Sequence, residues 1–234
     1  MSMHWKTPSG DAVAAVYIPY SHMDDDDARL FYDTINALLV YANDRLGIVD
    51  PDALRERPGA PCMLYERGGQ VADALWRNRG IVGDFVRDNP KRLTQEHLDC
   101  ARPWRWAVRD MFTVVDASED SVVYMNRTHL FVVGASQDPA DSHVHHIPSL
   151  MLLTLLPFKG GIVTSGMTIH LSQEPASWAL PLIAQQAKEF CARTIIATSE
   201  QLVAYGRKIP DGENLVTPLF QAEVDRGFAA GTLL

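Results

Sequence analysis

The chain has 234 residues, with 29 acidic against 21 basic side chains and a formal net charge of −8 at pH 7. Hydrophobic residues make up 47% and charged residues 21%, ordinary globular values that favour neither a disordered nor a membrane class. An acidic chain is repelled by phosphate backbones, so nucleic-acid binding is disfavoured. Three widely spaced cysteines without a CxxC pair indicate reduced, buried thiols in the cytoplasm rather than a disulfide framework.

The first part of the chain is expected to be mainly helical. Apolar residues at three-and-four spacing predict amphipathic helices, and the longest is opened by four aspartates and closed by Gly47. The aspartate run complements the helix dipole, and its spacing is not that of a calcium-binding loop. The expected elements are one strand at residues 12–18 and helices at residues 24–46, 70–86 (interrupted near Gly80) and 94–101.

After Pro103 the composition changes: short segments rich in Val, Phe, Thr and Tyr follow, and they predict antiparallel strands. Pro157 to Gly161 breaks the most apolar stretch of the chain into a hairpin. The expected strands are residues 111–115, 121–125, 128–133, 150–156 and 162–171. A continuous apolar stripe from Ala187 to Tyr205 then predicts one long helix with Pro181 in its first turn.

These elements predict an α+β fold in one domain: a helical N-terminal region, a small antiparallel sheet or barrel of about five strands, and a long C-terminal helix. The boundaries are residues 1–103 for the mainly helical part, 104–172 for the mainly β part, and 173–234 for the helix and tail.

One basic and aromatic cluster stands out, at residues 102–109. Alternation of Trp104 and Trp106 with Arg105 predicts an entering strand whose tryptophans pack on one face while the arginines cover the other. The alternative is binding of single-stranded nucleic acid through base stacking, with Arg102 and Arg109 as further members of the cluster.

Histidines supply the candidate metal ligands. His143 and His145 would point to one face of a strand, and His170 on a later strand could approach them, giving three imidazoles of the kind that zinc, iron or nickel prefers. The pattern loosely resembles the HxH pair and later histidine of cupins, but no Glu follows His145 closely and Pro148 interrupts the expected strand. The alternative is a loop of exposed histidines.

A further resemblance rests on three blocks: Leu75-Trp76-Arg77-Asn78, Phe85-Val86 with Asn89-Pro90, and Leu156-Pro157-Phe158-Lys159-Gly160 followed by Ile162 and Gly166. In this order they resemble the LW-N, FV-x-x-NP and LPFKG-x-I-x-x-x-G signature of a group of bacterial cytosolic proteins of unknown function. The group carries Tyr-Asp where this chain has Thr164-Ser165. The resemblance implies one cytoplasmic unit and names no activity.

No nucleophile elbow, P-loop or dinucleotide fingerprint occurs, so the sequence favours a non-enzymatic interaction or regulatory module. The alternative is a small metal-dependent enzyme at the histidines. The sequence identifies no cofactor and is compatible with a protein partner or with self-association. The expected binding residues are Lys159, Gly160 and Gly166 at the hairpin, with Trp76 and Asn78.

Overall fold

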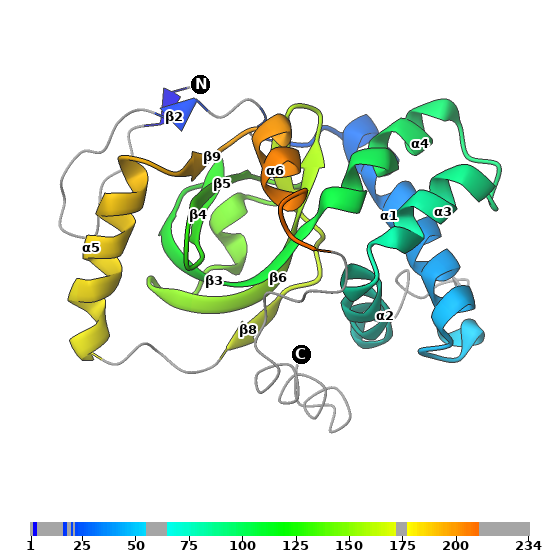
Figure 1. The fold of residues 1–234 in the computed structure, drawn as a ribbon, viewed down its shortest axis with the longest axis horizontal. Helices are drawn as coiled ribbons and strands as arrows, with labels where there is room; N and C mark the ends of the chain where they lie inside the picture. The colour runs from blue at the N-terminus through cyan, green and yellow to red at the C-terminus, as the bar shows by residue number, and fades with distance from the viewer. Residues whose placement is uncertain are drawn as a thin grey trace.

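The computed structural model describes residues 2–3, 16–17, 20, 22–54, 65–171 and 177–210, which form an α+β fold. Figure 1 shows a strongly curled sheet with helices α1 to α4 on one side, α5 on the other and α6 beside its edge. The helices are α1 (Asp25–Leu46), α2 (Tyr65–Arg77), α3 (Gly80–Asp88), α4 (Gln95–Ala101), α5 (Leu180–Cys191) and α6 (Ser199–Gly206). Short 3-10 helices are η1 (Pro51–Leu54), η2 (Arg102–Trp106), η3 (Ala140–His143) and η4 (Ser177–Ala179).

The sheet is mixed and not closed into a barrel. Its strand order is β7-β6-β3-β4-β5-β9, and β8 pairs with the same edge of β6 as β7 does. All pairings are antiparallel except β5 with β9. The strands are β3 (Val108–Ala117), β4 (Ser121–Met125), β5 (Leu130–Gly134), β6 (Ser149–Phe158), β7 (Gly161–Thr164), β8 (Ile169–Leu171) and β9 (Ile195–Ile196), with β1 (Ser2–Met3) and β2 (Val16–Tyr17) as a separate pair.

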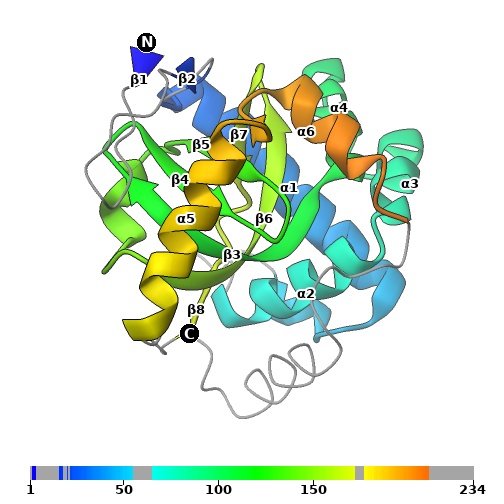
Figure 2. The ribbon, with the colours of Figure 1, turned by 60° about the vertical axis from the view of Figure 1, so that its left-hand side comes forward.

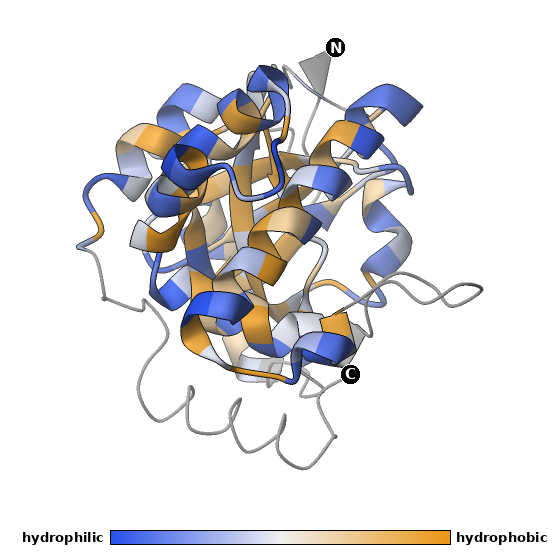
Figure 3. Ribbon diagram, turned by 90° about the vertical axis from the view of Figure 1, so that its right-hand side faces the viewer, coloured by the Kyte–Doolittle hydropathy of each residue, from blue (hydrophilic) through white to orange (hydrophobic). Residues whose placement is uncertain are grey.

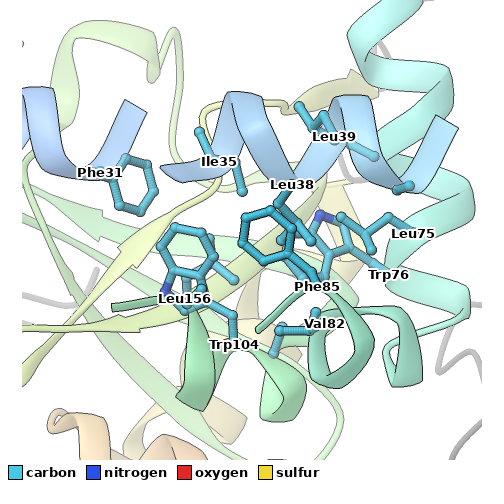
Figure 4. Close-up of a cluster of buried hydrophobic side chains, with 14 of the residues drawn as sticks. Phe31, Ile35, Leu38, Leu39, Leu75, Trp76, Val82, Phe85, Trp104 and Leu156 are labelled. Atoms are coloured by element: carbon cyan, nitrogen blue, oxygen red, sulfur yellow. The ribbon is translucent and has the colours of Figure 1, made fainter. Parts of the chain in front are cut away.

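Local signals explain α1 well. The Asp24 side chain accepts a hydrogen bond from the Asp27 amide at 2.8 Å and caps the helix, while Gly47 at φ +63° ends it. The helices turn hydrophobic residues toward the sheet and hydrophilic residues outward (Figure 3). In the resulting core, Phe31 of α1 meets the Trp104 ring edge-on with centroids 5.3 Å apart, and Leu156 of β6 lies beside them (Figure 4).

The two faces of the sheet support different cores. Alternate residues such as Phe112 and Leu153 fill the concave face, where Leu202 of α6 joins them. On the outer face, Val123 and Val132 pack against α5, which lies across β4 and β5 in Figure 2. The meander β3-β4-β5 and the hairpin β6-β7 confirm the predicted antiparallel pairings.

The predicted long C-terminal helix is wrong. The chain leaves α5 after Cys191, forms β9 alongside β5, and starts α6 after Thr198. Thr198 and Gln201 form a capping box, with Thr198 Oγ1 accepting from the Gln201 amide at 3.3 Å. The apolar stripe continues through this break because both helices and β9 face the same sheet.

Three other expectations change. Residues 102–106 form η2 rather than an entering strand, with Trp104 fully buried and its Nε1 donating to the Pro157 carbonyl at 3.1 Å. The predicted strand at residues 162–171 is two strands, β7 and β8, separated by a bend at Gly166. With β9 added, the sheet in the described part of the chain has seven strands rather than about five. Most of the expected strand at residues 12–18 and most of the expected tail at residues 206–234 lie outside the described residues.

Candidate functional site

The hairpin turn after β6 is a junction between elements rather than a free loop. Lys159 Nζ forms an ion pair with the Asp27 carboxylate in the first turn of α1, and the Tyr20 hydroxyl donates to the same carboxylate at 2.7 Å. Burial opposes charge on Asp27, but these hydrogen bonds outweigh it and lower the pKa of Asp27. The bond to Asp27 in turn raises the pKa of Lys159. Lys159, an expected binding residue, is thus engaged within the protein.

The glycines near this turn supply backbone conformations. Gly160 has φ +86° and its carbonyl accepts from the Ser199 amide at 2.9 Å, which joins the turn to α6. Gly161 lies so close to Tyr20 that an added Cβ would stand 2.5 Å from the Tyr20 Cβ. Gly166, at φ +78°, is exposed at the bend between β7 and β8. Binding by Gly160 and Gly166 stays a prediction.

Trp76 and Asn78 lie elsewhere. Trp76 is 4% exposed and belongs to the core beneath α1 (Figure 4), whereas Asn78 is exposed just after α2 and donates to the Ala74 carbonyl at 2.8 Å. Lys159 and Gly160 contact α1 and α6 instead. Binding by Lys159, Trp76 and Asn78 likewise stays a prediction.

The predicted histidine cluster comes together in part. The rings of His145 and His170 have centroids 5.6 Å apart. Burial, followed by the nearby imidazoles of His145, His143 and His146, lowers the pKa of His170. His143 ends η3 and His145 lies in irregular chain, so neither is on a strand as expected. Within the described part of the chain, no three His, Cys, Asp or Glu side chains are placed to hold one metal ion.

A layer of polar side chains is buried between α2 and the sheet, and sequence reasoning missed it. Arg109 on β3 stands opposite Thr154 on β6, and the Ser165 amide donates to the Thr154 carbonyl at 3.0 Å, so the three lie side by side across the sheet. From α2, the Asp73 carboxylate pairs with Arg109. We call Asp73, Trp76, Arg109, Thr154 and Ser165 the α2–sheet polar layer.

Three buried polar atoms in this layer reduce the stability of the folded state. The Thr154 hydroxyl, the Ser165 hydroxyl and the Trp76 Nε1 are buried without a hydrogen-bond partner. The three residues are 0%, 5% and 4% exposed. A buried polar group of this kind destabilises the folded state by about 1–3 kcal/mol. The sequence holds no signal for this arrangement, because α2, β6 and the end of β7 meet only in three dimensions.

A second group of residues forms a basic surface around the end of α6. The guanidinium groups of Arg105 and Arg207 stand 5.4 and 5.6 Å from the centroid of the Trp106 ring. Gly206 makes this approach possible, since an added Cβ there would lie 2.0 Å from the Trp106 carbonyl oxygen. We define the α6 basic surface by five residues: Trp106, Arg127, His129, Arg207 and Lys208.

A chain of hydrogen bonds positions the other side of this surface. Asn126 Nδ2 donates to buried Asp110 at 2.9 Å and to the Tyr205 hydroxyl at 3.1 Å. The Thr128 hydroxyl lies 3.2 Å from that of Tyr205 and 2.9 Å from His129 Nδ1. Burial raises the pKa of Asp110, whereas burial and the Lys208 charge lower the pKa of His129. Tyr205 and His129 are thus held rigidly, with ring centroids 4.7 Å apart.

The exposed cations of the α6 basic surface are distinguished by their lack of ion pairs with the described residues. Arg127, Arg207 and Lys208 are exposed, and they form no ion pair with any residue that the structure describes. Of the cluster considered in the sequence, Trp104 and Arg109 are buried, and Arg102 pairs with Asp99 at 3.2 Å. Only Arg105 and Trp106 of that cluster reach this surface.

Comparison of the chain with protein-family models, curated proteins and solved structures finds no match. Membership in the bacterial group with the LPFKG signature stays a prediction. Among the helices that the structure describes, none is both long and apolar enough to cross a membrane.

Proposed function

We propose that the protein is a non-enzymatic interaction module that binds an acidic segment of a partner protein through the α6 basic surface. The carrying observation is the set of three exposed cations, Arg127, Arg207 and Lys208, which have no ion-pair partner among the described residues of an acidic chain. Charge complementarity of this kind sets partner choice and association rate.

Two features favour an acidic peptide over a nucleic acid. The Trp106 ring is already engaged by two guanidinium groups of the protein, which compete with a stacking base. The net charge of −8 repels a polyanion along its whole length, whereas a short acidic segment interacts mainly within about 8 Å of the cations, the screening length in physiological salt. Arginine also matches carboxylates with two parallel hydrogen bonds.

The test uses the full chain and a fluorescent oligoglutamate peptide in an anisotropy titration at two salt concentrations. We expect salt-sensitive binding that the double reversal Arg207→Glu/Lys208→Glu weakens at least about tenfold, since each lost charge pair is worth about 1 kcal/mol. The matched control is Lys91→Glu/Arg92→Glu, another exposed pair of adjacent cations, in the segment between α3 and α4.

The same titration with an oligothymidylate of equal charge separates the alternatives. Tighter binding of the oligothymidylate, lost in Arg207→Glu/Lys208→Glu, would replace the acidic peptide with single-stranded nucleic acid. Equal affinity of wild type and the double reversal for oligoglutamate, or no binding at low salt, would refute the proposal. Circular dichroism of each variant checks that it is folded.

A second candidate is a small metal-dependent enzyme centred on His143, His145 and His170. The observation that favours it is the pair His145 and His170, which approach from η3–β6 and β8. Elemental analysis of protein purified without a histidine tag tests it. Stoichiometric zinc, iron or nickel that is lost in His170→Ala would support this function, whereas a metal-free protein whose melting temperature is unchanged by EDTA would refute it.

A further inference from the structure

Unpartnered donors gather in the α2–sheet polar layer, although similar groups nearby are satisfied. The Thr34 hydroxyl donates to the Leu30 carbonyl at 2.6 Å, and Trp104 Nε1 donates to the Pro157 carbonyl at 3.1 Å. In the polar layer, by contrast, two hydroxyls and one indole N–H have no partner. Costs of this kind persist where function requires the groups.

The chemistry of the layer selects for an anion. Arg77 Nη2 and Arg109 Nη2 both contact the Asp73 carboxylate, so two guanidinium groups share one carboxylate. Arginine keeps its charge in a buried site and presents several N–H donors to a carboxylate or phosphate. The unpartnered groups add two hydroxyls and an indole, all able to donate. A ligand rich in acceptors would satisfy them.

Geometry sets the size of the ligand. Thr154 lies on β6 and Ser165 follows the end of β7, and their backbones are joined by a hydrogen bond, so they stand about as far apart as neighbouring strands, about 5 Å. Two oxygens of a single carboxylate or phosphate group can bridge donors at that separation. Asp73 already presents such a group to Arg109 from α2.

We propose that the α2–sheet polar layer is the closed form of a binding site for a small oxyanion, with the Asp73 carboxylate holding the place of the ligand. On binding, α2 moves away from the sheet, Arg109 exchanges Asp73 for the anion, and the hydroxyls of Thr154 and Ser165 donate to it. No covalent bond changes. The site is separate from the α6 basic surface, and the proposal does not depend on the function proposed for that surface.

Thermal unfolding of the full chain tests this site. Sodium phosphate and sodium acetate are titrated against sodium chloride at equal ionic strength, which distinguishes a phosphate from a carboxylate ligand. We expect a saturable rise in Tm with one of them, of about 5–10 °C at a hundredfold excess over Kd. Thr154→Val and Ser165→Ala should each reduce the rise, and the double variant should abolish it.

Asp73→Asn and Thr34→Val sharpen the outcome. Asp73→Asn removes the internal competitor, so half-saturation should occur at a several-fold lower anion concentration. Thr34→Val alters an equally buried hydroxyl that is already paired, and the rise should persist. The proposal is overturned if neither anion gives a saturable rise, or if the rise survives in Thr154→Val/Ser165→Ala. Because the two single variants are conservative, at least one folded protein is expected for the comparison.

Discussion

Replacing Thr154 with valine should stabilise the protein. Thr154 is fully buried and its hydroxyl has no partner, so the folded state bears a desolvation cost of about 1–3 kcal/mol without a hydrogen bond in return. Valine has nearly the same shape and suits a strand at least as well. Residual strain reduces the gain, and we expect the free energy of unfolding to rise by about 1–2 kcal/mol.

Urea unfolding followed by tryptophan fluorescence measures this change, with Thr34→Val as the matched control. Thr34 is equally buried, but its hydroxyl donates to the Leu30 carbonyl, so the control should lose about 0.5–1.5 kcal/mol. The corresponding Tm of Thr154→Val should rise by about 2–4 °C per kcal/mol. A loss of stability in Thr154→Val comparable to that in Thr34→Val would mean that the Thr154 hydroxyl is paired in solution, and the reasoning on the polar layer would fail.

Three further predictions concern packing and pH. Gly206→Ala should lower the free energy of unfolding, measured by urea, by more than about 2 kcal/mol, because its Cβ would stand 2.0 Å from the Trp106 carbonyl oxygen. Gly80→Ala is the control and should be neutral or stabilising, because the space around Gly80 is open. Equal effects of the two variants would contradict the close crossing of α6 over η2. Lys159→Met should lower the free energy of unfolding by about 1 kcal/mol at neutral pH, because it removes the ion pair with Asp27. The difference should vanish as the pH falls through the lowered pKa of Asp27, where the carboxylate loses its charge. A pH-independent difference would mean that the ion pair is not its cause. The pKa of His170 is lowered in the folded state, so the unfolded chain binds a proton first as the pH falls. Tm should therefore decrease as the pH drops below about 6.5, and this decrease should be smaller in His170→Asn. An equal decrease in wild type and His170→Asn would exclude His170 as its cause.

Elements specified by neighbouring residues could be predicted from the sequence. Asp24 before α1 and Gly47 after it mark both helix ends through capping chemistry alone. The break at Pro157 to Gly161 likewise marks the β6-β7 hairpin, where Lys159 and Gly160 take left-handed conformations. Each of these signals lies within a few residues of the feature it determines.

Features that depend on distant residues were missed or misjudged. The helical spacing from Ala187 to Tyr205 hid β9, whose two residues are strand only because β5 lies beside them. Thr198 and Gln201 carried a capping signal for a new helix, but the apolar stripe outweighed it. The approach of His170 to His145 was anticipated, whereas the polar layer joins α2 to two strands and has no local pattern.

The position of β9 and α6 has a consequence for synthesis of the chain. Leu202 covers the concave face of the sheet, and the Ser199 hydroxyl donates to the Gly161 carbonyl at 2.6 Å, yet both residues lie about 40 positions or more after the hairpin that they contact. A nascent chain that has been synthesised only as far as β8 therefore exposes the apolar concave face of the sheet and the unpaired edge of β5. A chain shortened before residue 195 by ribosome stalling or proteolysis would therefore be inclined to aggregate, because it lacks β9 and α6, which cover these surfaces in the described fold.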